Sequence, residues 1–241
     1  MKIIGVAGTK NTGKTTLVTH IIAELKKRGF HVGSVKHAHG ELDVEGRDTW
    51  QHKNAGAELV VGTGNETFFN FSHSMELEEI LAIMKYIKNL DFVVLEGFKH
   101  SPYAKIATSD YAANEHDSRT IIKTVDVRKL DEQGIKSLVD LIEERSFGII
   151  QRLDCRKCGF ESCQEFRNAK ISGSAAADVQ CVTDSADVLL KVDGSFIPMN
   201  PFVKSLVRKV TLGMVESLRT EEFGAEDFEK IELMIKNEDN R

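Results

Sequence analysis

The fold of this chain is decided by one stretch near its amino terminus, Gly8-Thr9-Lys10-Asn11-Thr12-Gly13-Lys14-Thr15-Thr16. The stretch fits G-x-x-x-x-G-K-[ST], the pattern of a phosphate-binding P-loop. Residues 1–7 before it have the apolar pattern of a buried strand, and residues 17–28 after it have helical periodicity. A strand, a glycine loop and a helix in this order are the context that the motif requires. The sequence therefore predicts a site for a nucleoside triphosphate.

The residue types of the loop explain its chemistry. Gly8 and Gly13 let the backbone curl, so that its N–H groups point at phosphate oxygens. Lys14 can reach the β and γ phosphates, and the hydroxyl of Thr15 can ligate Mg²⁺. A glycine-rich turn that only joins a strand to a helix is the alternative, and it is disfavoured because motif and context both match. The residues assigned to nucleotide binding are Gly8, Thr9, Lys10, Asn11, Thr12, Gly13, Lys14, Thr15 and Thr16.

The composition is that of an ordinary globular protein. The chain has 241 residues, of which 41% are hydrophobic and 29% are charged, so it can form a sizeable core. A net charge of −5 argues against general binding to nucleic acid or to anionic membranes. There is no apolar run of about eighteen residues, as a membrane span would need. The amino terminus lacks the features of a signal peptide, so a cytoplasmic protein is expected.

Strand and helix patterns alternate along the first part of the chain. Strand patterns occupy residues 1–7, 30–35, 59–61, 67–71, 91–95, 105–108 and 120–125. Helical patterns occupy residues 17–28, 48–55, 74–87 and 131–145, with Ser74 as the expected cap of the third helix. This alternation predicts an α/β fold, a P-loop NTPase whose mainly parallel sheet is covered by helices on both faces.

Polar residues stand where three of the predicted strands end. The P-loop follows the first strand, Lys36 and His37 follow the second, and Glu96 ends the strand expected beside the first. Ligands of such sheets bind at the carboxyl ends of the strands, so these residues are expected to converge. Glu96 is then a Mg²⁺ ligand together with Thr15, or it positions the attacking water. A solvated strand end is the alternative for Glu96.

The polar loop after the second strand contains weaker candidates. Asp43 is assigned a catalytic role beside Lys14 and Glu96, as an acid that senses Mg²⁺ or orients water, although a plain solvated loop fits equally well. Two histidines, His37 and His39, do not make a metal site without further ligands. No Asn-Lys-x-Asp element is found, so the preferred base is not readable from the sequence.

Several motifs in a fixed order resemble the molybdopterin-guanine dinucleotide biosynthesis B family. They are Gly8-x-Lys10-Asn11-x-Gly13-Lys14-Thr15-Thr16-Leu17, Val35-Lys36-His37-x-His39, Asp43, Gly46, Asp48-Thr49, His52, Ala55-Gly56-Ala57 and Val94-Leu95-Glu96-Gly97-Phe98-Lys99. The resemblance covers residues 1–146, which we take as a P-loop domain. The family has adjacent proline and lysine residues, whereas two residues separate them here, in Pro102-Tyr103-Ala104-Lys105. Lys105 is therefore a weaker match to the family's lysine than the other motif residues are.

This resemblance implies a GTP-binding protein with weak GTPase activity, acting as an accessory protein and forming a homodimer. Such proteins assist the guanylyltransferase that joins GMP to molybdopterin. The implied cofactors are GTP and Mg²⁺, and the implied partners are the guanylyltransferase, molybdopterin and a molybdenum or tungsten apoenzyme. Hydrolysis is expected to be slow, because no arginine finger can be placed.

The four cysteines lie close together in the second part of the chain. Cys155, Cys158, Cys163 and Cys181 have the spacing C-x2-C-x4-C-x17-C. Three close thiolates with a distant fourth can hold a [4Fe–4S] cluster. Zn²⁺ on four thiolates is the main alternative, although zinc ribbons usually present two short cysteine pairs. Free thiols are a further alternative, and disulfides are not expected in the cytoplasm.

The segment around these cysteines resembles a small [4Fe–4S] domain of corrinoid iron–sulfur proteins and of electron-transfer subunits. The resemblance covers residues 153–182 and includes Phe166, Ala169 and Gly173. Residues 147–241 are therefore expected to form an iron–sulfur α+β domain. It is expected to contain a hairpin at residues 186–197, a helix at 202–219 and a terminal surface helix.

Three functions remain open at this point. The first is a GTP-binding adapter in the maturation of a molybdenum or tungsten cofactor, with an added [4Fe–4S] domain. The second is a P-loop NTPase that loads metals or clusters into target enzymes, which ATP preference would favour. The third is a redox sensor or electron carrier whose function does not depend on Lys14.

Overall fold

The structure is a computed structural model that describes residues 1–38, 40–109, 118–184, 188–193, 195–224, 228 and 230–235. Its contacts divide the chain into two units, Met1–Pro198 and Met199–Arg241. Residues 147–198, which include all four cysteines, thus pack in one unit with the P-loop. One predicted site residue, His39, lies outside the described residues.

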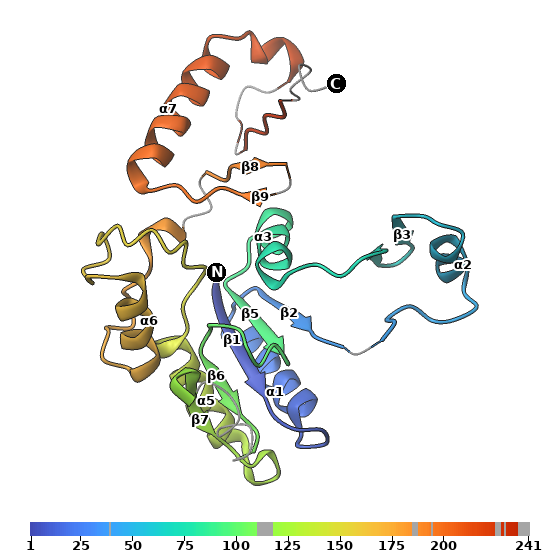
Figure 1. Cartoon of the computed structure of the whole chain (residues 1–241), viewed down its shortest axis with the longest axis vertical. Coiled ribbons are helices and arrows are strands. Elements are labelled where there is room, and N and C mark those ends of the chain that lie inside the picture. Colours follow the sequence, from blue (N-terminus) through green and yellow to red (C-terminus); the bar gives the residue numbers. More distant parts are fainter. Residues whose placement is uncertain are drawn as a thin grey trace. The chain divides into compact units, whose positions relative to one another are not determined.

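Five parallel strands form the central sheet in the order β2-β5-β1-β6-β7 (Figure 1). They are β1 (Lys2–Ala7), β2 (Val32–Lys36), β5 (Phe92–Glu96), β6 (Lys105–Ala107) and β7 (Ile121–Thr124). The two strands β1 and β5 are almost wholly buried, as their continuous apolar runs require of central strands. The predicted parallel sheet is therefore confirmed.

Helices cover both faces of this sheet. They are α1 (Lys14–Lys27), α3 (Leu77–Ile87) and α5 (Glu132–Arg145). The chain moves from β1 to β2 and from β2 back to β5 in opposite directions, so right-handed crossovers put α1 and α3 on opposite faces. The third helix, α5, packs beside α1.

The start of α3 differs from the prediction. Glu76, not Ser74, is the N-cap residue, because its carbonyl oxygen accepts the first helical hydrogen bonds from Glu79 and Ile80. Ser74 lies two residues too early to cap a helix that begins at Leu77. The boundary error is small and leaves the buried face of the helix, with Leu77 and Leu81, as predicted.

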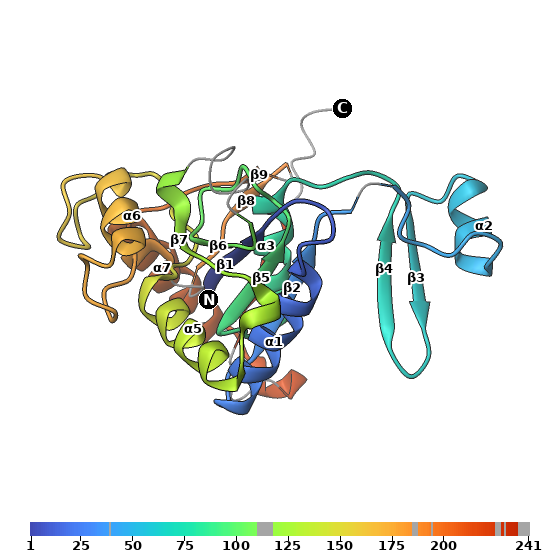
Figure 2. The same ribbon diagram turned by 90° about the horizontal axis from the view of Figure 1, so that it is seen from below.

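Residues 41–73, which we call the arm, carry a second small sheet (Figure 2). The arm contains α2 (Asp48–Asn54) and an antiparallel hairpin of β3 (Leu59–Thr63) and β4 (Thr67–Phe71). An isolated two-stranded hairpin is marginally stable, and here α2 packs against β3. The carboxylate of Asp43 adds a link, since it accepts hydrogen bonds from Thr49 on α2 and Asn70 on β4.

Residues 147–184, the cysteine segment, join the sheet at the amino end of β1. The short strand β6 pairs with β1 only from Gly5 to Ala7, so the first half of β1 has a free edge. Phe147 occupies this edge, and its carbonyl oxygen accepts a hydrogen bond of 2.9 Å from the Ile3 amide. The cysteine segment therefore begins as an extension of the central sheet.

A helix that the sequence analysis did not anticipate, α6 (Cys163–Ser172), forms the body of the cysteine segment. Its N-cap residue, Ser162, accepts from the Glu165 amide at 3.1 Å. The Glu165 carboxylate accepts from the amide of Glu161, one residue before the cap, at 2.8 Å. The buried ring of Phe166 packs against Phe147 and holds the helix to the sheet.

The remaining elements are small or belong to the second unit. The predicted hairpin is present as β8 (Lys191–Val192) and β9 (Ser195–Phe196). The predicted cap and proline start α7 (Pro201–Glu216), where Asn200 accepts from the Val203 amide. A short 3-10 turn, Thr220–Phe223, follows.

The expected terminal surface helix is wrong for the residues that can be judged. Residues 222 and 223 end the 3-10 turn, and residues 228 and 230–235 are not helical. Residues 225–227, 229 and 236–241 lie outside the described part of the chain. A short helix with no packed face is marginal in water, which explains the difference. In the parts of the chain that are described, no helix combines the length and apolar character needed to cross a membrane.

Asp184 fastens the end of the cysteine segment to the rest of the unit. One carboxylate oxygen lies 2.9 Å from the Lys85 ammonium and accepts from the Ile149 amide at 3.1 Å. The other oxygen lies 4.0 Å from the amino group of Met1. Because the Asp184 and Lys85 side chains are each only 10% exposed, this ion pair is largely shielded from water.

The substitution Asp184→Ala should lower the free energy of unfolding by about 3 kcal/mol, because it leaves a buried ammonium without its partner. Denaturant unfolding followed by circular dichroism measures the change. The matched control is Glu132→Gln, which removes exposed ion pairs to Lys27 and Lys136 and should leave stability essentially unchanged. Equal stability of the two variants would contradict the anchoring role of Asp184.

Candidate nucleotide-binding site

The backbone of the P-loop depends on two glycines. Gly13 precedes α1 in a left-handed conformation with φ 82°, and a Cβ there would lie 3.1 Å from Val127. A Cβ on Gly8 would lie 2.0 Å from the hydroxyl oxygen of Thr108. Any side chain at Gly8 would collide with Thr108, so the loop can take this path only with glycine.

Polar side chains tie the loop to itself and to β6. The Lys14 ammonium donates to the carbonyl oxygen of Thr9 and so spans the loop. The hydroxyl oxygens of Thr12 and Thr108 lie 2.6 Å apart, and Thr108 also donates to the carbonyl of Ala7. The hydrogen bonds of Thr108 thus fix the loop to the end of β6. The Lys14 ammonium lies within the loop, where a phosphate oxygen could replace the Thr9 carbonyl as its hydrogen-bond acceptor.

Three strand ends bring their polar groups together beside the loop. The Thr15 hydroxyl donates to a Glu96 carboxylate oxygen at 2.7 Å, and the Lys36 ammonium lies 3.2 Å from the same oxygen. Glu96 is 9% exposed and stands in register with Val6 on β1 and with Lys36 on β2. The convergence expected of the P-loop, Lys36 and Glu96 is confirmed.

This cluster of side chains fits a hydrated or directly bound Mg²⁺ ion. A hydroxyl and a carboxylate are hard oxygen ligands of the type that Mg²⁺ takes from proteins. They lie within one hydrogen bond of each other at the start of the loop. The neighbouring ammonium groups of Lys14 and Lys36 add the positive charge that a triphosphate needs.

Two further candidates, His37 and Asp43, make other contacts. The His37 amide donates to the carbonyl oxygen of Glu96, and its ring packs against Phe98. Asp43 instead belongs to the arm, where its carboxylate accepts from the Val44 amide, Thr49 and Asn70. The structure thus brings Thr15, Lys36 and Glu96 together, holds the Lys14 ammonium against Thr9 within the loop, and uses Asp43 to organise the arm.

Sequence reasoning missed residues that support the site. Thr108 ends the predicted strand 105–108, and the rule that ligands bind at the carboxyl ends of parallel strands would have found it. Val127 packs on Gly13, a contact with no local signal. Lys105, by contrast, was singled out by the family resemblance; it is fully buried, and its ammonium donates to the carbonyls of Ser101 and Tyr103 and to the hydroxyl of Thr120. Its observed contacts therefore stabilise the turn before β6.

The four cysteines provide a suitable donor set, but their side chains are not gathered around one point. All four thiols are free. The described residues contain no group of three or more side chains arranged to hold a metal ion. Burial raises the pKa of the Cys163 thiol, so a cationic partner would be needed to favour its thiolate.

The backbone before the cysteines has an unusual conformation. Arg152, Asp154 and Arg156 all have positive φ, at 53°, 43° and 58°. Alternation of left-handed residues with others turns successive N–H groups into a concave nest, a feature of anion and iron–sulfur sites. The chemistry of the donor set and this backbone both fit a cluster, whereas the thiol positions in this structure do not yet form one.

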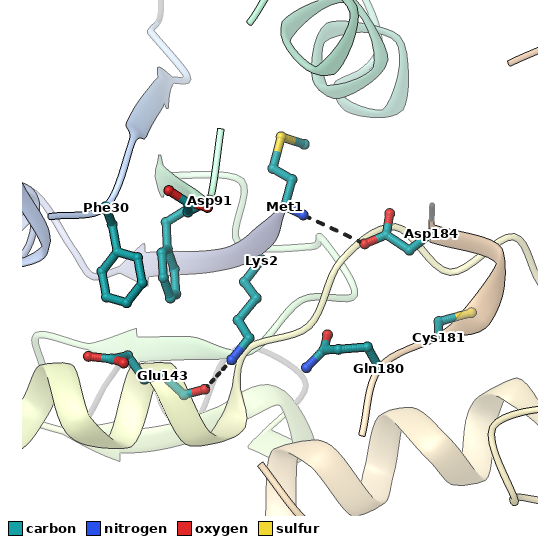
Figure 3. Close-up of a pocket in the computed structure, with 9 residues that line it drawn as sticks. Met1, Lys2, Phe30, Asp91, Glu143, Gln180, Cys181 and Asp184 are labelled. Carbon is teal, nitrogen blue, oxygen red and sulfur yellow. Dashed lines mark hydrogen bonds and ion pairs between the residues drawn. The ribbon is translucent and has the colours of Figure 1, made fainter. Parts of the chain in front are cut away.

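A cavity of about 390 Å³ lies at the amino end of β1, where the cysteine segment meets the sheet (Figure 3). Its wall includes Cys181, and the Lys2 ammonium donates there to the Glu143 carbonyl oxygen at 2.6 Å. The P-loop follows the other end of the same strand. A six-residue strand spans about 20 Å, so the cysteine segment and the P-loop occupy opposite edges of the sheet.

A parallel sheet with a P-loop after its central strand and a carboxylate at the end of the adjacent strand defines a P-loop nucleotide-binding protein. Residues 3–126 match the family model described as molybdopterin guanine dinucleotide synthesis protein B. The chain belongs to this family.

Named relatives cover the chain to different extents. A putative molybdopterin-guanine dinucleotide biosynthesis adapter protein of Methanocaldococcus jannaschii is 31% identical over 91% of this chain and 92% of its own length. The adapter protein of Escherichia coli is 28% identical over 59% of this chain and 91% of its own length. The crystal structure of Bacillus subtilis MobB covers 58% of this chain and 97% of its own, with 23% identity and a TM-score of 0.45.

Proposed function

We propose that this protein binds GTP with Mg²⁺ and serves as an adapter in molybdopterin guanine dinucleotide biosynthesis. The single observation that carries the nucleotide site is the 2.7 Å hydrogen bond between Thr15 and Glu96. It joins the P-loop hydroxyl to the acid of the neighbouring strand. Family membership and the names of the relatives supply the pathway. The proposed partners are the guanylyltransferase, molybdopterin and a molybdenum or tungsten apoenzyme, met in the cytoplasm.

Each polar group of the site has a role in this proposal. The loop N–H groups and Lys14 bind the β and γ phosphates, and Lys36 balances the charge of Glu96. When bound, Mg²⁺ neutralises phosphate charge, with Thr15 and Glu96 as its protein ligands. The cationic groups of the site are the side chains of Lys14 and Lys36. No arginine is assigned to stabilise the charge of the transition state, so the proposed GTP hydrolysis is slow.

Asp43 is proposed as the residue that connects the nucleotide to the arm. It lies in the segment that follows Lys36 and His37, and it accepts hydrogen bonds from both α2 and β4. In this proposal, nucleotide binding displaces Lys36, and the displacement is transmitted along the chain to Asp43 at the start of the arm. In this proposal Asp43 responds to the nucleotide without touching it.

Lys14→Ala should weaken GTP binding at least about 10-fold, because it removes a charged hydrogen-bond donor to phosphate. Calorimetry with GTP and ATP in the presence of Mg²⁺ measures the effect on anaerobically purified protein. Lys129→Ala changes an exposed lysine and is the matched control. Tighter binding of ATP than of GTP would refute the proposal and favour an NTPase that loads metals or clusters.

We further propose that Cys155, Cys158, Cys163 and Cys181 bind a [4Fe–4S] cluster. Their number, their free thiols and the positive φ values of Arg152, Asp154 and Arg156, which a nest of N–H groups would need, support it. Ordering of the cysteine loop around the cluster would bring the four sulfurs together. A bound cluster would add an electron-transfer group at the amino edge of the sheet.

Anaerobically purified protein should contain about four iron and four sulfide ions per chain, with broad absorption near 400 nm. Cys158→Ser should remove most of this absorption because one ligand is lost. Ser162→Ala changes the adjoining helix cap while keeping all four thiols, and should retain the cluster. One zinc ion per chain without iron would show that the site is a structural zinc site.

The arm supports the proposed homodimer. Val61 and Phe69 form a cross-strand pair and remain 47% and 55% exposed, and Leu59 beside them is 46% exposed. An apolar face on a two-stranded sheet is a typical interaction surface. A second copy of the chain is the occupant proposed for it.

Phe69→Glu should convert the dimer into a monomer, since it puts a charge into the proposed apolar contact. Sedimentation velocity at micromolar concentration distinguishes the two states. Glu66→Lys, in the exposed turn of the same hairpin, should keep the dimer. A monomeric wild-type protein, or a dimeric Phe69→Glu variant, would exclude this interface.

A further inference from the structure

One oxygen of the Glu96 carboxylate is shared by two donors. The Thr15 hydroxyl donates to Oε1 at 2.7 Å, and the Lys36 ammonium lies 3.2 Å from the same atom. Glu96 is buried, so water competes little for this oxygen. The Lys36 ammonium is therefore the cation that neutralises the carboxylate assigned above to Mg²⁺.

A single ion pair holds the Lys36 side chain in this position. Lys36 ends β2, which lies at the edge of the central sheet, and its side chain is 56% exposed. Among the residues that the structure describes, Glu96 is the only acidic partner of Lys36. An ion pair of an exposed, flexible lysine contributes little to stability. The ammonium can therefore leave Glu96 without disturbing the strand.

The second lysine of the site is held differently. The Lys14 ammonium donates to the carbonyl oxygen of Thr9, a neutral acceptor within the loop, and so leaves the Glu96 carboxylate to Lys36. A divalent cation cannot share Oε1 with the Lys36 ammonium, because two cations beside one buried oxygen repel each other strongly. Binding of Mg²⁺ to Glu96 therefore requires that Lys36 moves away.

We propose that Lys36 and Mg²⁺ bind alternately to the Glu96 carboxylate, and that this exchange makes the site selective for a nucleoside triphosphate. The inference rests on the nucleotide site of the function proposed above. Without a nucleotide, Lys36 keeps its ion pair and Mg²⁺ binds poorly. With a triphosphate, Lys36 leaves Glu96 and gains the terminal phosphate as a charged acceptor. A diphosphate lacks that phosphate, so the lost ion pair is not replaced.

The position of Lys36 brings the terminal phosphate within its reach. In P-loop proteins the metal ion beside the P-loop hydroxyl bridges oxygens of the β and γ phosphates. Lys36 and Thr15 share one oxygen of Glu96, so the ammonium starts next to that position. Lys36 is therefore a specificity-determining residue and not only a counter-charge for Glu96. A lysine that only balanced charge would, when replaced, change the binding of diphosphate and triphosphate equally.

The first test is a titration of the anaerobically purified full chain with Mn²⁺ in the absence of nucleotide, followed by electron paramagnetic resonance. Lys36→Gln should bind Mn²⁺ at least about 10-fold more tightly than the wild type, because no ammonium competes for the carboxylate. Adding Glu96→Gln should abolish this gain, and Lys36→Arg, which restores a cation, should show a smaller gain. The matched control, Lys136→Gln, removes a lysine from its ion pair with Glu132 and should bind like the wild type.

The second test is calorimetry with GTP and GDP in the presence of Mg²⁺. The wild type should prefer GTP, and Lys36→Gln should lower the ratio of the two affinities about 10-fold, mainly by weakening the binding of GTP. Lys136→Gln should keep the ratio. Because Lys36 is exposed, its variants should fold like the wild type, which circular dichroism verifies.

The outcomes separate this inference from the function on which it rests. An unchanged Mn²⁺ affinity in Lys36→Gln, or an unchanged ratio of GTP to GDP affinity, would overturn the exchange at Glu96 while leaving the nucleotide site in place. A wild type that binds neither nucleotide would refute the proposed function together with the triphosphate selectivity. The Mn²⁺ titration uses no nucleotide, so it would still show whether Lys36 competes with a cation.

Discussion

The parallel pairing of β1 with its two neighbours fixes where the polar groups of this protein meet. In the register of β1 and β5, Val6 stands beside Glu96, one residue before the end of β1. In the register of β2 and β5, Lys36 stands beside the same residue. A slip of one residue would turn the Glu96 carboxylate to the opposite face of the sheet, away from Thr15. The apolar residues of β1 and β5, which set this register, therefore determine where the Glu96 carboxylate lies relative to Thr15.

The same sheet separates two kinds of chemistry. Its carboxyl edge carries the P-loop, Glu96 and Lys36, whereas the cysteine segment starts at Phe147 on the free amino half of β1. About 20 Å of strand lies between them. In the proposed function, the cluster therefore does not act on the phosphates. The four cysteines lie beyond residues 3–126, the part of the chain that the family model matches. The cysteine segment is nevertheless built onto the same sheet and packs in one unit with the P-loop.

Local patterns in the sequence predicted the part of the site that local geometry determines. The loop, its glycines and the strand ends at Lys36 and Glu96 follow from motif and periodicity alone. The role of Asp43 did not, because it depends on Asn70, which is 27 residues away in the chain. Burial of Lys105 and the contact of Val127 with Gly13 are likewise long-range. These contacts arise only when the sheet has assembled.

The cysteine segment gives a different lesson. The start of α6 was readable, since Ser162 and Glu165 have the spacing of a capping box in the sequence. The sequence analysis interpreted this segment only as a metal-binding site, from the cysteine spacing, and did not predict α6. The positive φ values of Arg152, Asp154 and Arg156 have no sequence signal, because none of these residues is a glycine.

The measurement that tests the central claim most directly is the rate at which a guanylyltransferase joins GMP to molybdopterin in the presence and absence of this protein. The account predicts that the wild-type chain accelerates product formation and that the Lys14→Ala variant does not. Equal rates without the protein, with the wild type and with the variant would contradict the claim that this chain is a nucleotide-dependent adapter.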